Sequence, residues 1–150
     1  MSDAEIAFIG GSGLYEIDGL TDARHVEVDT PFGPPSDAIT LGKLGDRGVA
    51  FLPRHGRGHR YMPTEIPSRA NIYALKTLGV ERIISISAVG SLRESIAPLD
   101  MVVPDQLIDR TRNRASTFFG DGVAAHVGFA DPFCPEIRNA LADTAQEKSI

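Results

Sequence analysis

The stretch Arg82–Glu94, with the sequence Arg-Ile-Ile-Ser-Ile-Ser-Ala-Val-Gly-Ser-Leu-Arg-Glu, constrains the fold of this chain most strongly. Its first half is a short, β-branched apolar run between Gly79 and Gly90, a pattern typical of a strand buried on both faces of a mixed or parallel sheet. Open α/β sheets bind ligands where their parallel strands end, so the serines and glycine after the run predict an anion-binding surface. A core strand with incidental serines is the alternative, because Ser85 and Ser87 alternate and would share one face.

The composition indicates a globular protein. The chain has 150 residues, of which 42% are hydrophobic and 23% charged, enough for one domain with a core. Its net charge of −5 argues against a general nucleic-acid-binding protein, because such binding needs a basic face. The single cysteine, Cys134, excludes an intrachain disulfide, and no Cys/His spacing predicts a zinc site. The sequence shows neither a signal-peptide pattern nor a membrane-spanning run, which predicts a cytoplasmic protein without a membrane partner.

Two other stretches follow apolar runs and carry groups that bind anions. Glu5–Ile9 leads into Gly10–Gly13, where the backbone N–H groups and the Ser12 hydroxyl can form an anion-binding nest, although these residues also suit a simple tight turn. This loop matches neither the dinucleotide fingerprint nor the P-loop. Val49–Leu52 leads into Arg54–Arg60, which contains three arginines and two histidines. Arginine suits bidentate phosphate recognition and histidine adds a donor, whereas a solvated basic loop is the alternative interpretation.

Further apolar runs predict a mixed sheet. A hairpin turn is expected at Asp46–Gly48, so antiparallel strands should enter the sheet. Pro104 interrupts a later apolar pair, which predicts an edge or bulged strand. The strands expected from these patterns are His25–Val28, Ala38–Leu44, Val49–Leu52, and the pair Met101–Val103 with Gln106–Ile108.

A helix is expected after Pro67, because proline is tolerated in a first helical turn. Gly79 should stop this helix. Strand, helix and strand over Val49–Ala88 then form a βαβ-like unit, in which Arg54–His55 and Ser87–Ala88 can face one pocket if the strands run parallel. The predicted buried stripe of the helix consists of Ala70, Tyr73, Ala74, Leu75 and Leu78.

The last third of the sequence predicts a long functional loop and a helix. Asp109–Ala130 is polar and glycine-rich, and structureless stretches of this length seldom serve packing alone. Pro135 is expected to begin a helix with Ile137, Leu141 and Ala145 on one face.

Seven sequence blocks follow one another along the chain: Ile9–Leu14, Thr30–Gly33, Arg54–Gly56, Ala70–Ile72 with Ala74–Lys76, Ala88–Arg93, Asp105–Thr111 and Pro132–Pro135. In this order they resemble the trimeric purine nucleoside phosphorylase family, and within it the members that act on 5′-methylthioadenosine. The resemblance runs from Glu5 to the end of the chain and covers only the N-terminal half of the family's pattern. It implies a doubly wound α/β fold, in which a mixed sheet is flanked by helices and is incomplete in this chain. Residues 1–150 would be the N-terminal, phosphate-binding part of a single domain, in a protein that assembles as a homotrimer.

The resemblance also implies an activity. Phosphate would cleave 5′-methylthioadenosine to adenine and 5-methylthioribose 1-phosphate, in purine and methionine salvage. The expected partners are a small-molecule nucleoside and inorganic phosphate, which is a co-substrate, with no metal or organic cofactor. Two alternatives stay open: a phosphorylase for 6-oxopurine nucleosides or methylthioinosine, and a phosphate-binding fragment without catalysis of its own.

Residue by residue, the resemblance assigns phosphate binding to Ser12, Arg54, His55, Ser87 and Ala88. Residues expected close to the substrate are His59, Val89, Gly90 and His126. Val89 stands where many members of the family carry cysteine, and His126 matches a histidine that reaches the substrate bound to the neighbouring subunit. The purine-protonating aspartate and the ribose contacts are expected beyond Ile150. The 150 residues alone are therefore expected to be inactive and to fold poorly or aggregate.

Overall fold

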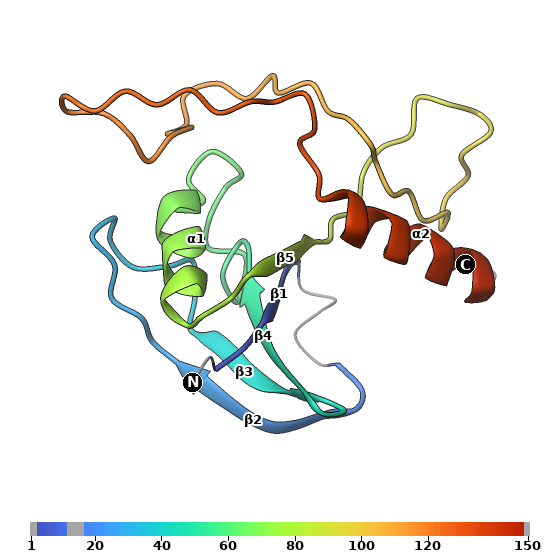
Figure 1. The fold of residues 1–150 in the computed structure, drawn as a ribbon, viewed down its shortest axis with the longest axis horizontal. Coiled ribbons are helices and arrows are strands. Elements are labelled where there is room, and N and C mark those ends of the chain that lie inside the picture. The colour runs from blue at the N-terminus through green and yellow to red at the C-terminus, as the bar shows by residue number, and fades with distance from the viewer. Residues whose placement is uncertain (1–2, 12–16, 149–150) are drawn as a thin grey trace. The chain divides into compact units, whose positions relative to one another are not determined.

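The computed structural model describes residues 3–11 and 17–148, and within them the strands form a five-stranded mixed sheet (Figure 1). The spatial order is β2-β3-β4-β1-β5. β1 pairs in parallel with β4 and β5, whereas β3 pairs antiparallel with β2 and β4. The strands are β1 (Ile6–Gly10), β2 (Leu20–Val26), β3 (Ile39–Leu44), β4 (Arg47–Pro53) and β5 (Arg82–Ser85), and the helices are α1 (Ser68–Thr77) and α2 (Pro135–Lys148).

The chain divides into two compact units. The first combines Met1–Ala88 with Arg112–Phe118 and contains the sheet and α1. The second combines Val89–Thr111 with Phe119–Ile150 and contains α2.

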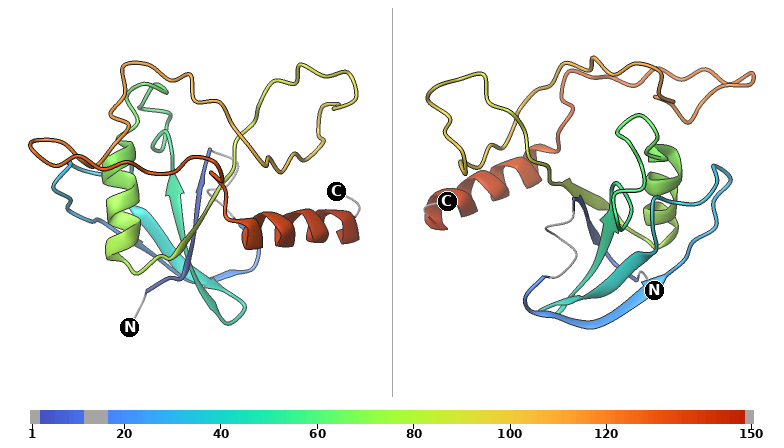
Figure 2. Two further views of the ribbon diagram at one scale, coloured as in Figure 1. Left: turned by 45° about the horizontal axis from the view of Figure 1, so that its top comes forward. Right: turned by 180° about the vertical axis from the view of Figure 1, so that it is seen from behind.

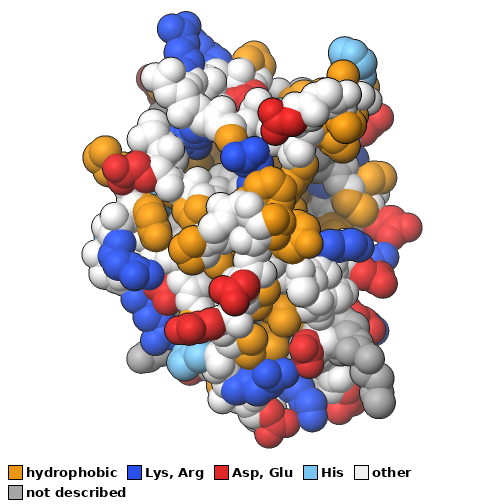
Figure 3. Space-filling model, turned by 90° about the vertical axis from the view of Figure 1, so that its left-hand side faces the viewer, with side chains coloured by type: hydrophobic (Ala, Val, Ile, Leu, Met, Phe, Trp, Pro, Cys, Tyr) orange, Lys and Arg blue, Asp and Glu red, His pale blue; other side chains and the backbone are white. Residues whose placement is uncertain are grey.

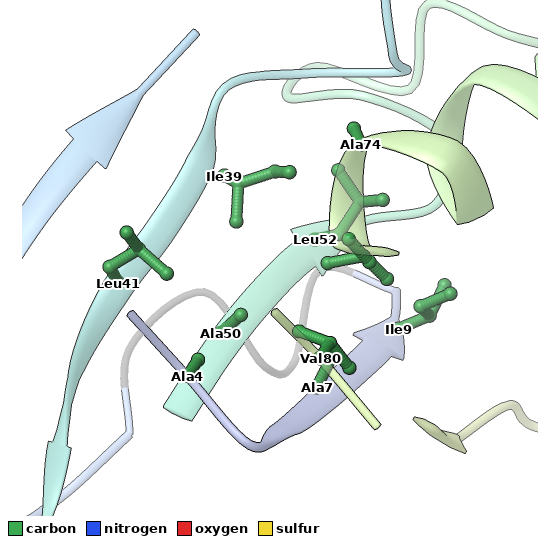
Figure 4. Packing of buried hydrophobic residues seen from close by; sticks show 10 residues of the cluster. Ala4, Ala7, Ile9, Ile39, Leu41, Ala50, Leu52, Ala74 and Val80 are labelled. Atoms are coloured by element: carbon green, nitrogen blue, oxygen red, sulfur yellow. The ribbon is translucent and has the colours of Figure 1, made fainter. Parts of the chain in front are cut away.

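The core of the first unit lies between the sheet and α1 (Figures 2 and 4). Alternate residues of two adjacent strands, Ala7 and Ile9 of β1 and Ala50 and Leu52 of β4, are buried together with Ala74 of α1. Three of these five residues are alanines, so the helix can approach the sheet closely. Complete burial of a leucine such as Leu52 stabilises the fold by about 1.5–3 kcal/mol.

Local sequence signals set both ends of α1. The helix begins directly after Pro67, as predicted. At its other end Gly79 adopts φ +89, and its N–H donates to the Lys76 carbonyl (3.0 Å). The Val80 N–H donates to the Leu75 carbonyl (3.1 Å), which completes a Schellman motif. The predicted stop at Gly79 is confirmed.

The predicted buried stripe of α1 needs two corrections. Tyr73 is 41% exposed, so it does not belong to the stripe. Asn71 is buried instead, because its side chain accepts a hydrogen bond from the loop that precedes β3. The burial of Ala70, Ala74 and Leu75 is confirmed.

The prediction that the Arg82 run is buried on both faces is wrong for this chain. β5 is the outermost strand of the sheet formed by the described residues, where Arg82 and Ser85 are exposed and Ile83 and Ile84 are half-buried. An apolar run predicts burial, but the burial of a strand depends on the neighbours that cover it. The strand itself and its parallel pairing with β1 are confirmed.

In the antiparallel half of the sheet, the predicted positions of one strand and one turn are wrong. β2 begins at Leu20 rather than at His25, and its register shifts between Thr21 and Arg24. Its exposed polar residues gave no periodic signal. The β3–β4 hairpin turns at Gly45 and Asp46, because Leu44 pairs with Arg47, so Gly48 lies in β4 and outside the turn.

The second unit is mostly irregular. α2 confirms the helix predicted at Pro135, and none of its residues 135–148 is buried. Asp109–Ala130, of which Arg112–Phe118 belongs to the first unit, is irregular apart from a bridge between Gly120 and Val123, as predicted for a long loop. The strands expected at Met101–Val103 and Gln106–Ile108 are absent from the described part of the chain. A strand needs a neighbour for its main-chain hydrogen bonds, and the apolar pattern does not supply one.

Hydrophobic side chains are common on the surface. Figure 3 shows them on one face of the molecule, between acidic and basic side chains. In the second unit Leu92, Leu99 and Ile108 are 103%, 101% and 86% exposed. No helix within residues 3–11 and 17–148 is long and apolar enough to cross a membrane.

Candidate functional site

Three parallel strands end at one edge of the sheet. Gly10 at the end of β1 lies opposite Pro53 at the end of β4, and Ile9 lies opposite Ser85 at the end of β5. Residues that follow these strands therefore leave the sheet at a common edge. Open α/β sheets bind their ligands at this kind of edge.

The structure brings four of the five predicted phosphate-binding residues to this edge. Arg54 and His55 follow β4 directly, and Ser87 and Ala88 follow β5 after one intervening residue. The fifth, Ser12, lies outside the described residues.

The Arg54 side chain connects the ends of β4 and β5. Its backbone N–H donates to the Gly10 carbonyl (2.9 Å), which places Arg54 beside the end of β1. Its Nη1 donates to the carbonyl of Ile86, the residue after β5, at 3.4 Å. A guanidinium carries five N–H donors in a planar fork, so donors beyond this contact can bind an oxyanion.

Two hydrogen bonds define the proton position on His55. Its Nδ1 lies 2.9 Å from the Tyr61 carbonyl, which can only accept, so Nδ1 carries the proton. Its Nε2 lies 3.3 Å from Arg54 Nε, which can only donate, so Nε2 is the acceptor. In this arrangement His55 orients Arg54.

The loop Arg54–Tyr61 closes on itself. The Tyr61 N–H donates to the His55 carbonyl (3.1 Å), and the Gly56 N–H donates to the Pro53 carbonyl (3.1 Å). His59, predicted close to the substrate, has φ 54 and stacks its ring on that of His55 with 5.9 Å between centroids. The structure therefore brings both histidines of the loop together.

Sequence reasoning missed a second layer of residues beneath this loop. Asp37 accepts hydrogen bonds from the Arg57 N–H (2.6 Å) and from Arg60 Nη2 (3.1 Å). Burial raises the pKa of Asp37, but the N–H groups of Arg57 and Ala38 and the charges of Arg60 and Arg57 outweigh burial. The pKa of Asp37 therefore lies below its ordinary value of 3.8, and the carboxylate is charged at neutral pH.

The remaining predicted site residues belong to the other unit. Val89, Gly90 and His126 lie in the second unit, and all three are exposed. Their part in a substrate site stays a prediction.

A concavity lies on the sheet face opposite α1, on the side of Phe8 and Phe51. It is a shallow, open hollow in which the rings of Phe8 and Phe51 stack with 5.0 Å between centroids. Neither Arg54 nor His55 is among the described residues that line it, but Gly10 and Pro53 at the ends of β1 and β4 are, so the hollow reaches the same edge of the sheet. Within the described part of the chain, no group of three or more His, Cys, Asp or Glu side chains could hold a metal ion.

Comparison with known sequences gives one consistent relationship. The model of a family described as the phosphorylase superfamily matches residues 5–150. The chain is 60% identical over 147 residues to the S-methyl-5′-thioadenosine phosphorylase of Thermosynechococcus vestitus, covering 98% of this chain and 51% of that protein. It is 59% identical over 143 residues to the protein of the same name from Geobacter sulfurreducens, covering 95% of this chain and 50% of that protein.

Solved structures give the same relationship. A crystal structure of a methylthioadenosine phosphorylase sourced from an antarctic soil metagenomic library has a TM-score of 0.95 and 59% identity, covering 100% of this chain and 52% of that chain. The methylthioadenosine phosphorylase from Schistosoma mansoni in complex with tubercidin has a TM-score of 0.90 and 40% identity, covering 98% and 53%. These likenesses confirm the predicted mixed-sheet fold and that it is incomplete here. The chain spans about half the length of the curated relatives it matches.

Proposed function

Because the chain belongs to the phosphorylase superfamily, we propose that the whole protein catalyses the phosphorolysis of 5′-methylthioadenosine. A phosphate oxygen forms a bond to the anomeric carbon while the glycosidic bond to the purine nitrogen breaks. The electron pair of that bond leaves with the purine, which takes up a proton. The products are adenine and 5-methylthioribose 1-phosphate.

One observation carries this proposal: the Arg54 side chain lies where three parallel strands end and joins β4 to the residue after β5. A guanidinium held at this edge can bind the phosphate bidentately and orient one oxygen for attack. The bound dianion also stabilises the positive charge that develops on the ribosyl group. The names of the relatives support the choice of substrate, since those at 54–60% identity are S-methyl-5′-thioadenosine phosphorylases.

The proposal extends to the setting of the reaction. Inorganic phosphate is the second substrate, and positioning and charge supply the catalysis without a metal or an organic cofactor. We place the reaction in the cytoplasm, in purine and methionine salvage, and the protein in a homotrimer. Sedimentation of the whole protein tests the trimer, and activity after dialysis against a chelator tests the independence from metal.

Replacing Arg54 by alanine in the whole protein tests the role of the guanidinium. We expect the KM for phosphate to rise by about 10- to 100-fold, because hydrogen bonds to a charged group contribute about 1.5–3 kcal/mol. The control is Arg47→Ala, which removes an arginine from an exposed ion pair with Glu5 (3.3 Å) at the other end of β4. An unchanged KM for phosphate in Arg54→Ala would show that Arg54 does not bind phosphate.

Product analysis tests the choice of nucleoside. We expect the whole protein to release adenine from 5′-methylthioadenosine faster than hypoxanthine from inosine or methylthioinosine. Solved structures of the Schistosoma mansoni enzyme include a complex with adenine, which supports a 6-aminopurine. Faster release of hypoxanthine would instead indicate a 6-oxopurine phosphorylase. Calorimetric phosphate binding without any product would indicate a binding module.

A further inference from the structure

The contacts beneath the Arg54–Tyr61 loop suggest a role for a residue that does not touch the substrate. We propose that Asp37 is a positioning residue for phosphate binding, because its carboxylate holds this loop through Arg57 and Arg60. The inference rests on the proposed function and names a further residue on which that function depends.

Both carboxylate oxygens of Asp37 are engaged. Oδ1 accepts a hydrogen bond from the Ala38 N–H at 2.9 Å, which fixes the side chain against its own backbone. Oδ2 accepts from the Arg57 N–H at 2.6 Å and from Arg60 Nη2 at 3.1 Å. The Asp37 side chain is only 15% exposed, so water screens these charged contacts weakly. One carboxylate thus holds the loop at two positions.

The neighbouring residue anchors this contact to the rest of the first unit. Ser36 is buried, and its N–H donates to Asn71 Oδ1 of α1 at 2.7 Å. Its hydroxyl donates to the Pro53 carbonyl at the end of β4 (2.7 Å), and its carbonyl accepts from Arg60 Nη2 (3.0 Å). The loop is therefore held both where it leaves β4 and where it returns, by a segment that is fixed to the helix.

The loop also packs against this segment at Gly56, where no side chain fits without displacing a neighbour. Gly56 has φ +69, and a Cβ built there would lie 2.8 Å from the Ser36 carbonyl oxygen and 3.1 Å from Arg60 Nε. Only glycine fits both the backbone conformation and the space. The path of the chain from Arg54 to Arg60 is thus set by contact with Ser36 and Asp37.

The three arginines of the loop have different contacts, so they serve two different roles. Arg60 pairs with Asp37, and Arg57 Nη2 lies 3.5 Å from His25 Nε2. Arg54 alone among them reaches the residue after β5. Removing the negative charge of Asp37 would make the loop more positive, which by itself would favour phosphate. Loss of position and gain of charge therefore change phosphate affinity in opposite directions.

Because the two effects have opposite signs, the direction of the change in phosphate affinity shows which of them dominates. In the whole protein, we expect Asp37→Asn to raise the KM and the calorimetric Kd for inorganic phosphate by about tenfold, while the KM for the nucleoside stays within about twofold. The control is Asp22→Asn, which removes the same charge from an exposed ion pair with Lys43, also at 3.1 Å. We expect this control to leave both KM values unchanged.

A second variant tests the same contact from the side of the loop. We expect Arg60→Gln to raise the phosphate KM as well. In the double variant Asp37→Asn, Arg60→Gln the increase should be smaller than the product of the two single effects, because the Asp37–Arg60 contact is lost in both single variants. If Asp37→Asn does not fold, Arg60→Gln alone decides.

Two results would overturn the role of Asp37. One is a phosphate KM that is unchanged or lowered in the foldable variants, and the other is a double variant in which the two effects multiply fully. Arg54→Ala separates this failure from failure of the proposed function: if it raises the phosphate KM while Asp37→Asn and Arg60→Gln do not, the function stands and the role of Asp37 fails. Phosphate calorimetry needs no turnover, so it decides the role of Asp37 even if no phosphorolysis is found.

Discussion

Substitution of two glycines in the Arg54–Tyr61 loop distinguishes the cost of backbone strain from the cost of steric crowding. Gly56 and Gly58 both have positive φ values, +69 and +76, but a Cβ at Gly58 would meet nothing within 4 Å among the described residues. We expect Gly58→Ala to lower the free energy of unfolding by about 1–2 kcal/mol, the cost of the left-handed conformation alone. Gly56→Ala should cost a further 1–3 kcal/mol, roughly, because the added methyl group displaces Arg60 or the Ser36 carbonyl.

Urea denaturation of the two variants in the whole protein measures this difference. Equal losses of stability would mean that the loop relaxes away from Ser36 without cost, which would also weaken the case for Asp37 as a positioning residue.

At the scale of residues, the sequence predicts the groups that follow strands and misses the ones that support them. Arg54 and His55 come directly after an apolar run, so their place at the sheet edge follows from local pattern. Asp37 lies 20 residues from Arg57, and no local signal links the two. In the sequence, Ser36 and Asp37 follow two prolines, a pattern that predicts only a turn. The buried Asn71 gave a weak signal, as a polar residue beside the apolar stripe of a helix.

At the scale of elements, the link between α1 and the loop before β3 depends on one side chain. Asn71 is buried on α1 and accepts the Ser36 N–H at 2.7 Å. We expect Asn71→Leu to lower the free energy of unfolding by about 1–3 kcal/mol, because the Ser36 N–H would stay buried without an acceptor.

The matched control for this variant is Asn139→Leu on α2, an exposed helical position, where we expect a change within about 0.5 kcal/mol. Thermal unfolding of the whole protein provides the comparison. A similar small change in both variants would show that water or a rearranged backbone satisfies Ser36.

Elements with local signals were predicted well, and those that depend on neighbours were not. α1 has proline before its first residue and a glycine after its last turn, and both ends were correct. The extent of β2 and the burial of β5 depend on which strands lie beside them. The apolar runs near Met101 and Gln106 resemble strands in sequence, yet the described residues give them no partner. An apolar run therefore predicts a strand, but it does not show whether other strands or helices cover both faces of that strand.

At the scale of the whole molecule, the second unit exposes apolar side chains that proteins normally bury. Leu92, Leu99 and Ile108 are almost fully exposed in the described structure. We expect residues 1–150, expressed alone, to associate with increasing concentration, because exposed apolar surface drives association. Light scattering at several concentrations measures this.

A triple substitution of these three residues by serine should reduce the association. The control replaces three exposed charged residues of the same unit by serine: Glu94, Asp105 and Arg110. A monodisperse sample of the unaltered 150 residues would contradict the expectation, as would an equal effect of the two triple substitutions.

The parallel pairing of β1 has a consequence for the order of events during synthesis. β3 and β4 are joined by a tight hairpin, so they can pair as soon as both have left the ribosome. β1 is made before them, but its two neighbours are β4 and, much later, β5. Synthesis proceeds at about 5–20 residues per second, so several seconds pass between the synthesis of β1 and that of β5. Until then β1 cannot be paired on both sides. Among the strands of the described residues, the first to be synthesised is thus among the last to be paired on both sides, and its apolar side chains stay uncovered during that interval.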